Sequence, residues 1–102
     1  MQIEFTAPLW LWQSAKPDAK AGSWHFITVP AEQAGLIRMA VPRRAGFGSV
    51  RIKASIGATS WSTSIFPDSK NGTFLLPIKA DVRKREGLAV GEEAGVTLSI
   101  DV

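Results

Sequence analysis

The amino-acid sequence predicts a small, mostly β protein of the β-rich α+β type. We expect a pseudo-barrel of about six to eight strands, closed at its ends by two short helices. Short stretches in which apolar and polar residues alternate predict the strands, and glycine or proline separates one stretch from the next. The length of 102 residues suits one domain, which we expect to span the whole chain, 1–102.

The first strand is predicted at the N-terminus, where every second residue over 3–11 is apolar. Trp10 and Trp12 would point away from this apolar side. Pro8 has no backbone N–H, so the strand should lie at a sheet edge or bend there.

The next elements are a loop, a strand and a helix. Residues 13–23 are polar and contain proline and glycine, which predicts a loop, and 24–29 are aromatic and β-branched, which predicts a strand. Pro30 introduces a helix over 31–40, which Gly35 should limit to one or two turns. A basic loop over 42–48 follows.

The middle of the chain predicts a pair of strands and a tight hairpin. Residues 50–56 alternate strictly, Gly57 interrupts them, and 58–66 form the second strand. Pro67 to Ser69 have the composition of a turn. Asn71-Gly72 predicts a type I′ hairpin before a strand at 74–76.

The second helix is predicted from Pro77 to a left-handed cap at Gly87. Ile78 and Val82 are four residues apart and would face the core. Asp81 and Arg85 can pair on the outside. The last strand follows, with Val96, Leu98 and Ile100 on one side.

The surroundings of the two helices are similar, which predicts an internal repeat. Residues 24–57 and 73–102 both run strand, proline, short helix, glycine, strand. Two such halves would be related by a pseudo-twofold axis and would close one barrel, which covers exposed strand edges.

Residues 76–102 contain an apolar-proline pair, a short basic helix and a Gly-Leu pair. By these features they resemble the swapped-hairpin DNA-binding proteins typified by AbrB and MazE, with Glu92 and Ala94 as departures.

A second set of residues spans nearly the full length of the chain: Phe5, Ala7, Gly22, Trp24, Phe26, Val29, Pro30, Gly57, Trp61, Ser64, Phe66, Pro67, Leu76, Pro77, Lys79, Val82, Arg83, Gly87, Leu88 and Gly91. Through these residues the chain resembles a prokaryotic domain-of-unknown-function family of the double-split β-barrel class, sometimes found beside bacteriocin-protection or YdeI-like segments. This resemblance implies the fold and leaves the activity open.

The composition argues against most enzyme classes. The chain has no cysteine and one histidine, His25, which excludes thiol chemistry and disfavours zinc sites and Ser–His–Asp catalysis. Ser60, Ser62, Thr63 and Ser64 alternate along a strand, as residues on a solvent-facing side do. We therefore predict no catalytic residues, no cofactor and no metal, and we favour a binding domain over an enzyme.

Two surfaces are candidates for binding. Trp10, Trp12, Trp24 and Trp61 could line a groove for a small molecule or a protein, although all four could instead belong to the core. Nucleic acid is the alternative partner, because residues 33–67 contain several cations and no acidic residue. Its candidate contacts are Arg43, Arg44, Arg51, Lys53, Arg83 and Lys84.

The remaining expectations concern net charge, oligomeric state and localisation. The net charge of +3 is modest, and a basic solvated face explains it as well as an anionic partner does. The chain has neither a membrane-length apolar run nor the layout of a signal peptide. We expect a cytoplasmic monomer or weak homodimer that does not bind membranes.

Overall fold

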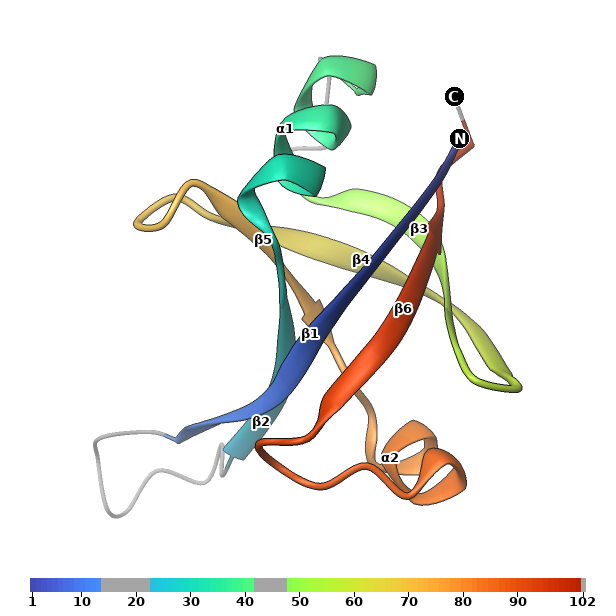
Figure 1. Cartoon of the computed structure of the whole chain (residues 1–102). Helices are drawn as coiled ribbons and strands as arrows, with labels where there is room; N and C mark the ends of the chain where they lie inside the picture. Colours follow the sequence, from blue (N-terminus) through green and yellow to red (C-terminus); the bar gives the residue numbers. More distant parts are fainter. Residues whose placement is uncertain (14–22, 42–47, 102) are drawn as a thin grey trace.

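A computed structural model describes residues 1–13, 23–41 and 48–101 (Figure 1). In this part of the chain, six antiparallel strands close a barrel in the order β1-β2-β5-β4-β3-β6. The strands are β1 (Gln2–Gln13), β2 (Ser23–Val29), β3 (Val50–Ile56), β4 (Thr59–Asp68), β5 (Thr73–Pro77) and β6 (Glu93–Ser99). The helices α1 (Ala31–Ala40) and α2 (Ala80–Glu86) lie at opposite ends of the barrel. The predicted fold class is confirmed.

The core fills the inside of the barrel because every strand turns its apolar side inward. β1 and β3 alternate between exposed and buried residues over most of their lengths, as their sequences predict. Leu9, Ile27, Ile65, Leu76 and Leu98 come from different strands and are almost completely buried. Burying a side chain of this size contributes about 1.5–3 kcal/mol.

Two long strands, β1 and β4, each take part in two sheets. Gln2–Pro8 of β1 pair with β6, and Leu9–Gln13 pair with β2. In β4, the residues up to Ile65 pair with β3, and those from Phe66 pair with β5. We call the two halves of the barrel the β3–β6 sheet and the β2–β5 sheet. The sheet edge predicted as one alternative for Pro8 is not observed, because Pro8 pairs with Glu93 inside the closed barrel, next to the change of partner at Leu9.

The strand pairing has a twofold pattern. If β1 is exchanged with β4, β2 with β5 and β3 with β6, the same set of neighbouring strand pairs results. Each set contains a long strand, its hairpin partner, a helix and a third strand. The half-repeats predicted over 24–57 and 73–102 contain β2–α1–β3 and β5–α2–β6. The division of the chain into these two half-repeats stays a prediction.

The first helix occupies the predicted residues but is not cut short by Gly35, and the second helix begins later than predicted. α1 spans ten residues, longer than one or two turns, because Ala34 and Ile37 are fully buried and this packing outweighs the low propensity of Gly35. α2 begins at Ala80 instead of Pro77, since Pro77 still pairs with Phe26 as the last residue of β5. Its other predicted features are confirmed: Gly87 is left-handed with φ 62°, and Asp81 pairs with Arg85 at 3.5 Å.

The hairpin between β4 and β5 is longer than predicted. Asp68 pairs with Thr73, so four residues form the loop and the strand continues past Pro67. A type I′ turn requires positive φ at both central residues, but only Gly72 has it, with φ 68°. Asn71 instead donates its side-chain amide to the Asp68 carboxylate at 2.8 Å. The predicted loops at 13–23 and 42–48 lie largely outside the described residues.

Candidate functional site

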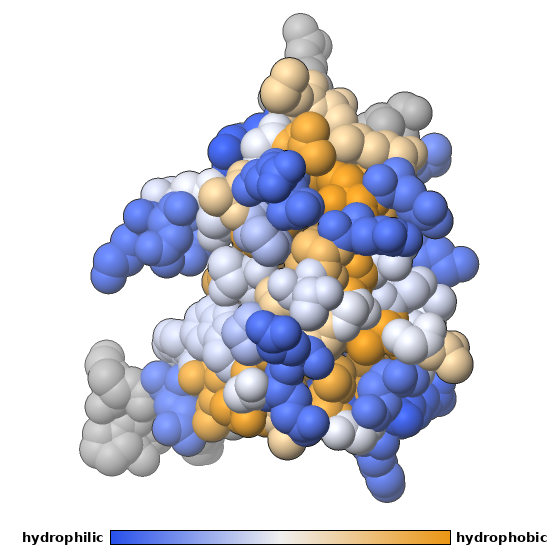
Figure 2. Space-filling view, viewed as in Figure 1, coloured by the Kyte–Doolittle hydropathy of each residue, from blue (hydrophilic) through white to orange (hydrophobic). Residues whose placement is uncertain are grey.

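An apolar hollow lies on the outer side of the β2–β5 sheet. It has a volume of about 410 Å³, and all four strands of this sheet contribute to it. We call it the aromatic hollow, and its lining residues are Trp10, Trp12, Trp24, Phe26, Phe66 and Leu75. Figure 2 shows pale and hydrophobic side chains at the surface on the lower left, where β1 and β2 lie in Figure 1.

The floor of the aromatic hollow is fixed by direct contacts. The Trp10 indole donates a hydrogen bond from Nε1 to Thr28 Oγ1 at 2.9 Å, and its ring lies 5.4 Å from that of Phe26. Phe26 also stacks on Trp24, with the rings 6.2 Å apart and 9° from parallel. Trp24 and Trp12 remain 51% and 44% exposed. The hollow therefore combines a fixed floor with open aromatic walls.

The outward residues of β1 and β4 change character where these strands change sheets. In the β3–β6 sheet, β1 presents Gln2, Glu4 and Thr6, and β4 presents serines at 60, 62 and 64. In the β2–β5 sheet, the same strands present Trp10, Trp12 and Phe66. The outward aromatic residues of β1 and β4 thus lie on one side of the barrel, over the β2–β5 sheet.

A second hollow adjoins the first and carries positive charge. It has a volume of about 360 Å³, and we call it the cationic hollow. Trp24, His25, Pro77, Ile78, Lys79, Ala80 and Arg83 line it. Trp24 lines both hollows. Pro77 of the cationic hollow pairs directly with Phe26 of the aromatic hollow.

Hydrogen bonds hold the cationic hollow together. The Arg83 guanidinium donates to the carbonyl oxygen of Ile78 at 3.0 Å, and the backbone N–H of Ile78 donates to the carbonyl oxygen of His25 at 2.9 Å. Burial lowers the pKa of His25 below its ordinary value of 6.5, and the positive charge of Arg83 lowers it further. His25 is therefore neutral near pH 7, and the positive charge here belongs to Lys79 and Arg83.

The structure brings three of the four predicted tryptophans together. Trp10, Trp12 and Trp24 share the aromatic hollow, whereas Trp61 lies in the part of β4 that pairs with β3 and packs against the core. Trp61 falls on the same side of β4 as buried Thr59 and Ile65, which explains the difference. Sequence reasoning did not place Phe26, Phe66, Leu75 or Lys79 in a site. Strand alternation could have identified the two phenylalanines, because it places both on the outward side of their strands.

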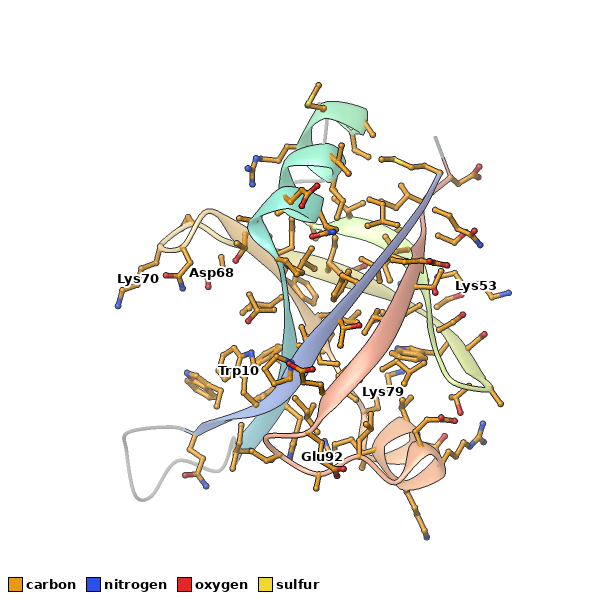
Figure 3. The ribbon with its side chains drawn as sticks, in the orientation of Figure 1. Trp10, Lys53, Asp68, Lys70, Lys79 and Glu92 are labelled. Carbon is orange, nitrogen blue, oxygen red and sulfur yellow. The ribbon has the colours of Figure 1, made fainter. Side chains whose placement is uncertain are left out.

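The predicted basic residues are divided between separate places. Arg51 and Lys53 are exposed on β3 and line a different shallow hollow with Ser62 and Ser99. Arg83 and Lys84 belong to α2. Figure 3 shows Trp10 and Lys53 on different sides of the barrel. Arg43 and Arg44 lie outside the described residues.

In the part of the chain that the structure describes, His25 has no hydroxyl nucleophile beside it in its hollow. The residues that line the hollow with His25 include no serine or threonine hydroxyl. Among residues 1–13, 23–41 and 48–101, no group of three or more histidine, aspartate or glutamate side chains could hold a metal ion. Within the same ranges, no helix is long and apolar enough to cross a membrane.

These features define the chain as a closed β-barrel domain with two adjoining surface hollows. The chain belongs to the DUF1905 family, described as a domain of unknown function, whose model matches residues 5–98. A comparison with curated proteins gives no match. The expected membership of a domain-of-unknown-function family is thereby confirmed.

Proposed function

We propose that this protein is a non-enzymatic binding domain whose aromatic hollow holds a small ligand with a flat, apolar body. The change of outward residues along β1 and β4 carries the proposal. Both sheets bury similar apolar residues inside the barrel, so the fold does not require aromatic residues outside. Exposing large aromatic side chains beside one another is unfavourable in water and typical of a binding surface.

The size and lining of the hollow favour a small molecule. Small-molecule sites commonly occupy about 300–1,000 Å³ and are lined mostly by apolar and aromatic side chains. The aromatic hollow, at about 410 Å³, lies at the lower end of this range. Trp10 and Phe26 are already fixed by the contact with Thr28 and by ring stacking, so binding would order few side chains.

A neutral fluorescent probe tests this proposal. N-phenyl-1-naphthylamine carries a flat naphthalene ring, is apolar and uncharged, and its emission rises when it leaves water. We expect saturable binding to the protein, weakened at least about tenfold by Trp12→Ser or Trp24→Ser. Trp61→Phe is the matched control, because it also removes one tryptophan but lies outside the hollow. It should change the affinity less than about twofold.

Three results would contradict the proposal. The first is the absence of saturable binding to a protein that melts cooperatively. The second is equal weakening by Trp61→Phe and Trp12→Ser. The third is probe binding that falls as protein concentration rises, because this would show that a second copy of the chain covers the hollow. Melting curves of each variant separate lost binding from lost folding.

DNA binding through a basic face, as in AbrB-like regulators, is the second candidate. It is supported by Arg51 and Lys53, which are exposed two residues apart on the outer side of β3. Fluorescence anisotropy with duplex DNA at ~50 and ~200 mM salt tests it, since phosphate contacts make affinity fall steeply with salt. No binding at the lower salt concentration would exclude it.

A further inference from the structure

We infer that the aromatic and cationic hollows form one composite site for a small organic anion, a molecule with a flat apolar body and one carboxylate, sulfonate or phosphate group. The inference rests on the proposed function and adds the chemical class of the ligand. Its basis is the shared boundary of the two hollows, formed by Trp24 and by the Phe26–Pro77 pair.

The cations of the second hollow are placed to bind an anion. The hydrogen bond from Arg83 to the Ile78 carbonyl fixes one edge of the guanidinium, which has further N–H groups to donate. Lys79 is exposed and immediately precedes α2. A partly desolvated guanidinium and an ammonium together form the arrangement that binds carboxylate and phosphate groups well.

Among the described residues, no carboxylate lines the cationic hollow. Asp81 pairs with Arg85 on the exposed side of α2, at 3.5 Å. Glu86 accepts a hydrogen bond from Thr59 Oγ1 at 2.6 Å, which directs it toward the β3–β4 turn. Neither residue lines either hollow. The positive charge of Lys79 and Arg83 therefore lies next to an uncharged aromatic surface.

The two hollows match the two parts of such a ligand. The flat body would lie against Trp12, Trp24 and Phe66, and the anionic group would reach past Trp24 toward Lys79 and Arg83. His25 adds no charge here because its pKa is lowered, so the attraction for the anionic group comes from Lys79 and Arg83. A neutral ligand would use only the aromatic part.

A matched pair of probes tests the composite site. 8-Anilino-1-naphthalenesulfonate has the ring system of the neutral probe N-phenyl-1-naphthylamine plus one sulfonate. We expect Lys79→Gln to weaken binding of the sulfonate probe about fivefold to tenfold, the effect of losing one charge-assisted contact. The same substitution should change binding of the neutral probe less than about twofold. Raising the salt concentration should weaken only the sulfonate probe.

Lys53→Gln is the matched control, because it removes the same charge from the other side of the barrel. It should leave the affinity for both probes within about twofold. Lys79→Arg should retain most of the affinity for the sulfonate probe, which distinguishes loss of charge from loss of fold. The inference is overturned if Lys79→Gln and Lys53→Gln weaken the sulfonate probe equally, or if Lys79→Gln weakens both probes equally. Failure of the neutral probe to bind wild-type protein would instead contradict the proposed function.

Discussion

The two sheets of the barrel are alike on the inside and different on the outside. The β3–β6 sheet buries Leu98, Ala54 and Val96 and presents serines, threonines and charged residues to solvent. The β2–β5 sheet buries Ile27 and Leu76 equally well but presents tryptophan and phenylalanine. The comparison separates the residues that hold the fold from those available for binding. Both sheets contribute to stability, whereas the proposed binding surface belongs to one.

The largest expected effects come from the shared interior. Leu76→Ala in the β2–β5 sheet and Leu98→Ala in the β3–β6 sheet each remove a fully buried side chain. Each should lower the free energy of unfolding by about 2–5 kcal/mol, measured by urea denaturation. A loss below about 1 kcal/mol for one variant, with the expected loss for the other, would show that the two interiors are unequal.

The hairpin turns of the two sheets give a second comparison. Gly57, between β3 and β4, and Gly72, between β4 and β5, both have positive φ. A Cβ at Gly57 would overlap the Glu86 carboxylate and disturb its hydrogen bond with Thr59, whereas a Cβ at Gly72 has open space. Thermal unfolding should show a loss of about 2–3 kcal/mol for Gly57→Ala and about 1–2 kcal/mol for Gly72→Ala. Equal losses of stability in the two variants would mean that overlap with Glu86 does not add to the cost of Gly57→Ala.

Removing one hydrogen bond from the outer face of each sheet should give a smaller difference in stability. Trp10→Phe removes the bond to Thr28 beneath the aromatic hollow, at a cost of about 1 kcal/mol. Ser60→Ala removes the exposed hydrogen bond between the Ser55 and Ser60 hydroxyls and should cost about 0.5 kcal/mol or less. Denaturant titration of both variants measures this difference, and a larger cost for Ser60→Ala would contradict it.

The smallest expected effect concerns protonation beside the cationic hollow. NMR titration of the only histidine, His25, should give a pKa below 6.5. Because the folded state disfavours the charged ring, His25 contributes stability at a pH above its unfolded pKa and loses it as the pH falls through the folded pKa. Arg83→Gln should raise the pKa of His25, whereas Lys53→Gln on the other side of the barrel should not. An unchanged pKa of His25 in Arg83→Gln would show that the charge of Arg83 does not act on the histidine ring.

Alternation along the strands made most of the fold predictable, because one side of each strand must be buried. Inward Ile3, Phe5, Val50 and Ile52 all followed from this rule. Local signals were less decisive where neighbours compete. Pairing with Phe26 kept Pro77 in a strand, and the contact between Asn71 and Asp68 replaced the tighter turn.

The candidate site was only partly predictable, because alternation gives the side of a strand but not which strands become neighbours. Trp10 and Trp12 were predicted to point outward and Trp24 was a candidate for lining a groove, and β1 and β2 pair directly. Phe66 lies far away in the sequence and joins them only because β4 leaves β3 to pair with β5. The cationic hollow likewise depends on Ile78 bonding to His25, a contact between distant segments.

The crossing of β1 and β4 from one sheet to the other also affects how the barrel opens. Each of these strands is hydrogen-bonded at one end to one sheet and at the other end to the second, so separating either sheet disturbs strands that the other needs. Regions that share their hydrogen-bonded elements exchange their amide protons through common opening events. The barrel should therefore unfold as a single cooperative unit, and a ligand bound on one side should slow amide exchange in both sheets.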